Sequence, residues 1–213
     1  MSAIKAIAGK SHLGPWSAGW PEPVTITLGP AALEAQPSAY IQAVWKDRKY
    51  GTAASVGVSA AVAGNEVLVR LEWQAVSPRF GITDNNVFPD GCGVLLPANG
   101  EDAELSTMGS PDAPVVSWYW RAGTDVPFVG DAQGLGTVSR RKSHVLKAAA
   151  EWANGRWAVV FRSPAGEHGL PANGAALRAA FGVWTGANEE RAGLAAYSQD
   201  WSEIAMPASR GGR

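Results

Sequence analysis

The sequence contains one cysteine and only three histidines, so it has few residues with which to build disulfides or the common metal sites. Cys92 has no second cysteine for an internal disulfide, a thiolate metal site or the C-x-x-C-H attachment of a covalently bound haem. His12, His144 and His168 are not spaced as metal ligands and form no H-E-x-x-H pattern. A zinc or non-haem iron centre is therefore not expected.

Charge is also scarce. Charged residues make up 17% of the chain, against about 25% in ordinary soluble domains. Lys+Arg number 18 and Asp+Glu 19, so the net charge of −1 provides no basic field for phosphates. We expect no nucleic-acid partner, and a surface that is partly covered by another subunit.

Long apolar runs are missing. No stretch reaches the roughly 18 apolar residues that a membrane-spanning helix needs. Residues 1–10 hold no apolar segment of the length found in secretory signals. Three expectations remain: a cytoplasmic protein, a trimmed mature form, or a subunit exported on a partner that carries the signal.

Catalytic and nucleotide-binding motifs are absent as well. The chain has no G-x-S-x-G elbow, no G-x-x-x-x-G-K-[ST] loop and no G-x-G-x-x-G after a predicted strand. Gly134-Leu-Gly136 is the nearest glycine pair, and without a following helix it is more simply a turn or bulge. No nucleophile or acid–base constellation can be assembled, so an independent enzyme is the class with least support.

Short β-rich runs separated by turn residues occupy most of the chain. This pattern predicts an all-β fold, an antiparallel β-sandwich of about ten strands, rather than βαβ units. Residues 148–152, inside one predicted strand, and residues 188–196 are the only plausible helical segments. The predicted strands cover residues 24–28, 40–45, 55–62, 66–74, 88–97, 115–121, 143–152, 156–162 and 176–185.

A single domain is the simplest organisation for 213 residues. Residues 1–23 contain closely spaced prolines and are expected to form an extended N-terminal arm. Residues 24–205 are expected to form the sandwich, and residues 206–213 a C-terminal tail.

Ten tryptophans are unusually many for a chain of this length. Trp118 and Trp120 fall on one face of a predicted strand, and Tyr119 between them falls on the other. Such residues can fill the core of a thick sandwich, line a flat cofactor pocket or form a sugar-binding platform. Composition alone does not choose among the three.

An ordered series of segments runs from about residue 24 to residue 201 and is more specific than any single motif. Its members are 69–73, 88–91, 95–97, 108–109, 114–121, 134–137, 147–152, 154–162, 181–188 and Trp201. The series resembles the haem b subunits, or gamma subunits, of the type II dimethyl sulfoxide reductase family of molybdoenzymes. This family includes ethylbenzene, dimethyl sulfide, chlorate and selenate enzymes.

The resemblance implies a haem b that is bound non-covalently between a methionine and a lysine. The matching positions are Met108 and Lys147, with His144 and then Lys142 as alternatives to the lysine. A soft thioether favours ferrous iron and raises the reduction potential. A lysine ligand must be neutral, so burial and the metal must lower the pKa of its ammonium group.

The same resemblance implies the surroundings of the haem and the partners of the chain. Trp118, Trp120 and Phe88 are the expected pocket residues, and the haem is expected between the layers of the sandwich. The chain would be a non-catalytic electron-transfer subunit beside an iron–sulfur (beta) subunit and a molybdenum (alpha) subunit. An external carrier such as cytochrome c would exchange electrons with it.

The resemblance also implies a periplasmic location, with a cytoplasmic one left open. Two other classes compete with an electron-transfer subunit. One is a carbohydrate- or ligand-binding β-sandwich module without haem, because exposed tryptophans stack on sugars. The other is a structural subunit that has kept the sandwich and lost the cofactor.

Overall fold

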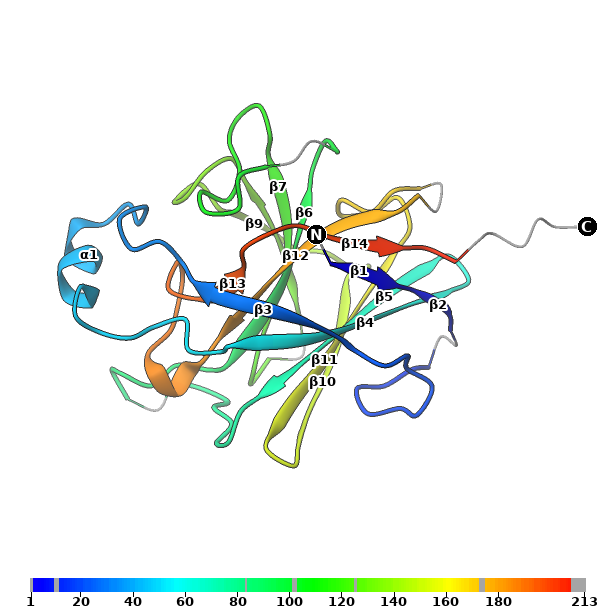
Figure 1. Cartoon of the computed structure of the whole chain (residues 1–213), viewed down its shortest axis with the longest axis horizontal. Helices are drawn as coiled ribbons and strands as arrows, with labels where there is room; N and C mark the ends of the chain where they lie inside the picture. Colours follow the sequence, from blue (N-terminus) through cyan, green and yellow to red (C-terminus); the bar gives the residue numbers. More distant parts are fainter. Residues whose placement is uncertain are drawn as a thin grey trace, which may run out of the picture.

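Strands form nearly all of the regular structure of this protein (Figure 1). The computed structural model describes residues 2–9, 12–82, 84–100, 103–124, 126–172 and 175–207. The strands are β1 (Ala3–Lys5), β2 (Ile7–Ala8), β3 (Val24–Pro30), β4 (Ser55–Ala63), β5 (Glu66–Gln74), β6 (Gly91–Pro97), β7 (Val115–Arg121), β8 (Phe128–Ala132), β9 (Ser139–Arg141), β10 (Lys147–Ala153), β11 (Arg156–Pro164), β12 (Leu177–Trp184), β13 (Ala196–Ser198) and β14 (Ser202–Ala205). The helices are α1 (Ala39–Trp45) and the 3-10 turn η1 (Gly186–Asn188).

The strands pack as two layers. The first sheet has the order β10-β11-β5-β4-β3, and the second sheet has the order β13-β12-β6-β7-β8-β9. Strand β3 pairs with β4 and also with β13, so the two sheets join along that edge. These neighbours are antiparallel, whereas β1 beside β14 and β2 beside β4 are parallel pairs. The predicted all-β antiparallel sandwich is confirmed.

Large side chains fill the space between the two sheets. Trp118 on the second sheet lies 6.2 Å, centroid to centroid, from Phe161 on the first. The ring of Trp120 meets that of Trp157 edge to face at 5.2 Å. Such aromatic contacts stabilise a core by about 0.5–1.5 kcal/mol each beyond the area that they bury. The interlayer space is therefore a packed core.

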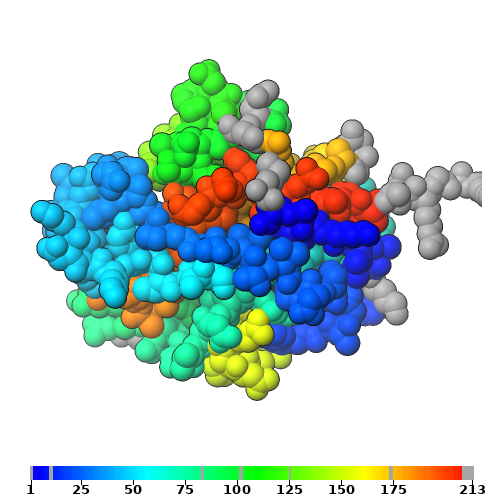
Figure 2. Space-filling view, in the orientation of Figure 1, coloured from blue at the N-terminus to red at the C-terminus, as the bar shows by residue number. Residues whose placement is uncertain are grey.

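Part of the segment before β3, which includes Leu13 and Pro15, covers the outer face of the first sheet, whereas Ile4 of β1 lies in the interlayer core. Leu13 is buried in one cluster with Leu68 of β5 and Val160 of β11. Arg70 of β5 forms a buried ion pair with Glu72, and its Nε donates to the Pro15 carbonyl at 2.6 Å. Figure 2 shows this arm, in dark blue, lying against the body of the molecule.

Residues 40–45, predicted as a strand, form α1 instead, so that prediction is wrong. Ser38 caps this helix, since its side chain accepts from the Ile41 N–H at 3.4 Å. Trp45 alone is buried, while Tyr40 is exposed. The aromatic and β-branched residues that suggested a strand have no neighbouring strand with which to pair.

Two other predicted boundaries are wrong. The expected strand 143–152 begins only at Lys147, because Ser143 Oγ accepts from the Leu146 N–H at 2.8 Å and turns the chain. Residues 148–152 are strand, not helix, and the helix expected at 188–196 is the short turn η1. The rest of that expected helix leads into β13.

Fourteen strands occur in the described residues, against the ten or so predicted. Short strands such as β8, β9 and β13 carry too few residues to show a periodic pattern. In the described part of the chain, neither helix has the length and apolar character needed to cross a bilayer. Residues 208–213 of the expected C-terminal tail lie outside the described residues.

Candidate functional site

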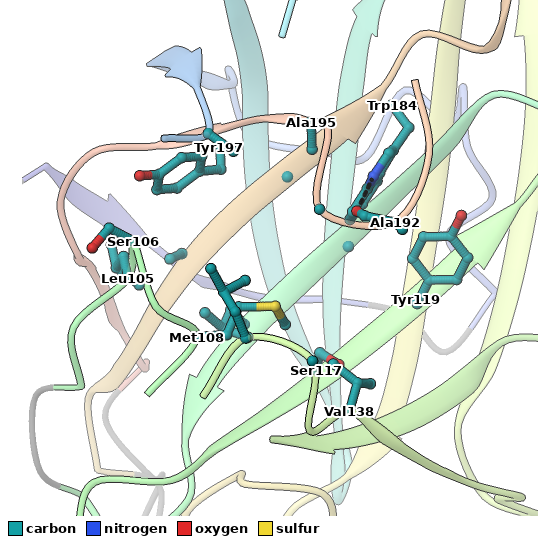
Figure 3. Close-up of a pocket in the computed structure, with 18 of the residues that line it drawn as sticks. Leu105, Ser106, Met108, Ser117, Tyr119, Val138, Trp184, Ala192, Ala195 and Tyr197 are labelled. Carbon is teal, nitrogen blue, oxygen red and sulfur yellow. Dashed lines mark hydrogen bonds between the residues drawn. The ribbon is translucent and has the colours of Figure 1, made fainter. Parts of the chain in front are cut away.

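A cavity of about 580 Å³ lies on the outer face of the second sheet (Figure 3). Side chains along a strand point alternately to its two faces. The residues next to those that face the interlayer core therefore point outward, toward the cavity. The floor of the cavity is made of small residues. Gly93 of β6 pairs directly with Gly182 of β12, and Ala180 and Ser117 lie beside them. The floor is therefore flat enough for a planar group to approach the sheet.

Loops, the start of α1 and larger side chains from the strands form the walls of the cavity. Among the described residues, most of the lining is apolar or aromatic, which suits a group that avoids water. The wall residues are Ala31, Gln36, Pro37, Ser38, Ile41, Leu105, Ser106, Met108, Tyr119, Phe128, Leu135, Gly136, Val138, Arg140, Trp184, Ala192, Gly193, Ala195 and Tyr197.

Met108 stands in a tight turn with its side chain half-buried. Its φ of 57° is in the left-handed region, which non-glycine residues seldom adopt. The surroundings hold it there: the Met108 N–H donates to the Leu105 carbonyl at 3.2 Å, and the Met108 carbonyl accepts from the Gly134 N–H at 3.2 Å. Figure 3 shows the thioether reaching into the cavity. This backbone conformation fixes the direction in which the Met108 side chain leaves the turn.

Trp184 and Tyr119 form a second wall. Their rings meet edge to face at 5.0 Å, and the Trp184 Nε1–H donates to the Ala192 carbonyl at 2.9 Å. A Cβ added at Gly182 would lie in ordinary contact with the Trp184 ring, at 3.4 Å, so only a side chain larger than alanine would crowd this ring. Burial raises the pKa of Tyr119 to about 12, so its phenol stays protonated at neutral pH.

Arg140 supplies the one charge among the described residues that line the cavity. It lies on the edge strand β9, and its guanidinium carbon is 4.0 Å from the centre of the Phe128 ring. This cation–π contact fixes the side chain at the rim. A carboxylate entering the cavity would meet a cation there.

Hydrogen bonds from buried side chains hold the segment between β12 and β13 in place. Glu190 is buried, and its carboxylate accepts from the Thr52 N–H at 2.9 Å and the Thr185 N–H at 2.8 Å. Gln36 Nε2 donates to the Gly193 carbonyl at 3.1 Å, which ties the segment to the approach of α1. The wall that carries Ala192 and Ala195 is therefore preformed.

Met108 lines the cavity, but Lys147 does not. Lys147 is exposed at the start of β10, in the first sheet, opposite Arg162 of β11. Lys142 and His144 are exposed in the connection between β9 and β10. In the described chain, no lysine or histidine lines the cavity, and no three His, Cys, Asp or Glu residues gather as a metal site.

The aromatic residues predicted for the pocket lie elsewhere. Trp118 borders the cavity only at the strand itself, because its ring lies in the interlayer core. There the Trp118 Nε1–H donates to the His168 carbonyl at 3.0 Å. Trp120 is also in that core, and Phe88 stacks under Arg191 outside the cavity. Tyr119, on the opposite face of β7 from Trp118 and Trp120, faces the cavity instead.

The cavity fits a flat, largely apolar cofactor such as haem. Its volume falls within the range of about 300–1,000 Å³ of such sites. Met108 offers a thioether, a known axial ligand of haem iron, and Arg140 offers a partner for a propionate. The haem was expected between the layers, but that space is filled by the core, and the cavity lies outside it.

Similar solved structures share the fold. A family 9 carbohydrate-binding module from Caldicellulosiruptor kristjanssonii in complex with glucose has a TM-score of 0.51 at 9% identity, over 100% of this chain and 99% of that one. The module in complex with cellotriose has a TM-score of 0.50 at 7% identity, over 100% and 98%. At this identity the likeness shows the β-sandwich fold alone. No family model matches the chain.

Curated relatives identify the family. The chain is 30% identical to chlorate reductase subunit gamma of Ideonella dechloratans, over 94% of this chain and 82% of that protein. It is 29% identical to dimethylsulfide dehydrogenase subunit gamma of Rhodovulum sulfidophilum, over 62% and 53%. A Haloferax mediterranei protein, provisionally named a respiratory nitrate reductase heme subunit, is 29% identical over 67% and 52%. The chain belongs to the family of haem b gamma subunits of these molybdoenzyme complexes, the family that its ordered segments resemble.

Proposed function

We propose that this chain is the haem b electron-transfer subunit of a heterotrimeric molybdenum oxidoreductase and that the cavity on the second sheet holds the haem. Membership of the gamma-subunit family supports the role. The observation that carries the site is Met108, a thioether held by a fixed turn in an apolar cavity.

Different residues of the cavity would bind different parts of the haem. Met108 would ligate the iron, and the small floor residues Gly93 and Gly182 would let the macrocycle lie against the sheet. Arg140 would pair with a propionate at the rim. When bound, the haem supplies one-electron chemistry, while the apolar walls exclude water and the thioether favours the reduced iron.

The partners follow from the same proposal. An iron–sulfur beta subunit would exchange single electrons with this haem, and a molybdenum alpha subunit would turn over the substrate. An external carrier such as cytochrome c would complete the relay. In this scheme the chain itself performs no substrate chemistry, and the compartment that we propose is the periplasm.

Haem content and its dependence on Met108 test the proposal. The full chain, produced with its partner subunits, should give a b-type pyridine haemochrome and a Soret band that shifts on reduction. Met108→Leu keeps the size of the side chain and removes the sulfur, so the ferrous spectrum should change and haem retention should fall at least tenfold, about 1.4 kcal/mol.

Met206 provides the matched control, since it packs against the interlayer core and does not line the cavity. Met206→Leu should leave the spectrum unchanged. A colourless protein in every preparation would remove the proposal and leave a sugar-binding module or a haem-free structural subunit. Equal effects of the two substitutions would move the haem away from this cavity.

A further inference from the structure

We infer that residues 31–50, which include α1, form a lid over the cavity, and that this lid moves away from Gly136 to let a flat ligand in or out. The inference rests on the proposed function and deepens it, because it names the part of the chain that moves when the cavity is filled. The lid supplies one wall of the cavity, through residues 31, 36–38 and 41. Figure 1 shows this segment, between β3 and β4, projecting from one side of the two sheets.

The lid is held together mainly by contacts within itself. Of its residues, all of which the structure describes, only Gln36 and Trp45 are buried, and the Trp45 ring packs on Tyr50 and Arg48 of the lid. The Tyr50 hydroxyl donates to the Ala31 carbonyl and so joins the two ends of the lid. No lid residue belongs to the hydrophobic core clusters of the described chain. A segment with so few buried apolar contacts opens at a lower free energy than the core strands.

One side of the lid is fastened to the segment between β12 and β13. Arg48 forms an ion pair with Glu189 at 2.9 Å. The Asn188 side-chain amide donates to the Lys49 carbonyl at 3.0 Å. The hydrogen bond from the Gln36 side chain to the same segment, described above, adds a third link. These three links form the hinge, because they keep this side of the lid attached when the other side moves.

The other side of the lid rests on the loop between β8 and β9. A Cβ built on Gly136 of this loop would lie 3.5 Å from Cγ and 3.8 Å from Cβ of Pro37, which is ordinary van der Waals contact. Within the described parts of the chain, no hydrogen bond or ion pair joins the lid to residues 133–138. Leu135 and Val138, on either side of Gly136, line the cavity. Separating Pro37 from Gly136 therefore opens the cavity without breaking a hydrogen bond.

A disulfide across this contact tests the lid. The 3.8 Å separation lies within the range of about 3.5–4.5 Å between the Cβ atoms of disulfides. In the double variant Pro37→Cys/Gly136→Cys, oxidation should therefore hold the lid closed, and dithiothreitol should release it. Cys92 is buried in the core, so it does not compete for the new cysteines. Gly136 has a φ of 82°, and Gly136→Cys alone is the matched control for strain at this position.

Metal-free protoporphyrin IX is the probe, because it is flat and largely apolar and has no iron to ligate. Quenching of tryptophan fluorescence follows its uptake by the full chain prepared without haem. Uptake should slow by about tenfold or more in the oxidised double variant and recover on reduction, while Gly136→Cys alone should respond to neither treatment. If the porphyrin is loaded before the disulfide is formed, its release should slow as well, since a lid delays movement in both directions.

Hydrogen exchange of the parent chain is a second measurement, and it needs no disulfide. The backbone amides of α1 should exchange through local opening much faster than those of β5, whose side chains are buried. Bound porphyrin should slow the exchange of the α1 amides, because the lid then closes on a filled cavity.

The outcomes separate the inference from the proposed function. Uptake at the same rate by the oxidised and reduced double variant would overturn the inference and leave the proposed haem site in place. Faster release after oxidation would also overturn it, because the disulfide would then distort the cavity rather than close it. The same holds if the α1 amides are protected as well as those of β5. If the parent chain bound neither porphyrin nor haem, the proposed function and the inference would fail together.

Discussion

The outer faces of the two sheets differ, because one is covered by the N-terminal arm and the other carries the cavity. On the first sheet, Leu68, Arg70 and Glu72 of β5 point outward and are buried, because the N-terminal arm covers them. On the second sheet, the outward residues Gly93 and Gly182 form the floor of a cavity. Both sheets pack their inner faces in the same core. The arm covers one outer face, while the other keeps the cavity in which we propose that the haem binds.

The prediction with the largest expected effect tests whether the covered outer face of the first sheet contributes to the stability of the protein. Glu72 accepts from both Arg70 and Arg156, and only the second of these arginines reaches water. Glu72→Gln leaves the Arg70 guanidinium buried without a counter-ion, so the free energy of unfolding should fall by about 3–5 kcal/mol. Denaturant titration measures this loss.

Glu66→Gln on the same strand is the control. Its pair with Arg162 is long, at 3.6 Å, and both partners are half-buried, so the loss should stay below about 1 kcal/mol. The fraction of folded protein that carries haem should change in neither variant. A fall in haem binding by Glu72→Gln would show that the two faces are coupled.

Substitutions at two adjacent residues of β12 should separate the contribution of the core to stability from the haem binding proposed for the outer face. Val183 is in the core, so Val183→Ala should lower the free energy of unfolding by about 2 kcal/mol and leave haem binding unchanged. Gly182 faces the cavity, so Gly182→Val should crowd Trp184 and weaken haem binding about tenfold with a smaller loss of stability.

Urea titration and haem titration of both variants provide the measurements. The comparison of the two faces fails if Val183→Ala weakens haem binding as much as Gly182→Val does. It also fails if Gly182→Val binds haem as the parent protein does, because the floor would then not contact the cofactor.

The smallest expected effect is a pH dependence of stability where the loop after β11 meets β9. His168, in the loop after β11, contacts Arg141 of β9 at 3.1 Å and Ser143 at 2.6 Å through its two ring nitrogens. Burial and then the nearby Arg141 lower the pKa of His168, while Glu167 and Asp131 oppose this. The folded protein therefore resists protonation at this ring.

Below an unfolded pKa of about 6.5 the unfolded chain binds more protons here than the folded chain. Stability should therefore fall as the pH drops below that value, and the fall should level off below the lowered folded pKa. Urea unfolding between about pH 5 and 7.5 measures the slope. His168→Asn should reduce the slope and His144→Gln, at an exposed position, should not. An unchanged slope in His168→Asn would assign the effect to carboxylates.

Local sequence patterns predicted the strands that alternate cleanly. The predicted bounds of 66–74 and 115–121 agree with β5 and β7, whose β-branched and aromatic residues repeat every second position. Residues 40–45 carried similar residue types but form a helix, because the Ser38 cap and the lack of a partner strand decide the outcome. Pairing depends on distant segments and is not visible locally.

The site was predicted less completely than the fold. The resemblance pointed to Met108, which the structure places in the cavity. It pointed to Lys147 and Trp120 as well, and these lie on the first sheet and in the interlayer core. Alternation separates the two faces of a strand but does not say which face is the core, so the sequence did not show that Tyr119, rather than Trp120, faces the cavity.

The parallel pairing of β1 with β14 has a consequence for the order of folding. Ala3 lies opposite Glu203, so the first strand of the chain finds its place only after the last strand has been synthesised. Contacts between residues so far apart along the chain slow folding, because the intervening chain must first be closed into a loop. The walls of the cavity likewise come from residues between Ala31 and Tyr197. The haem that we propose for this cavity would therefore meet complete walls only after Tyr197 has been synthesised.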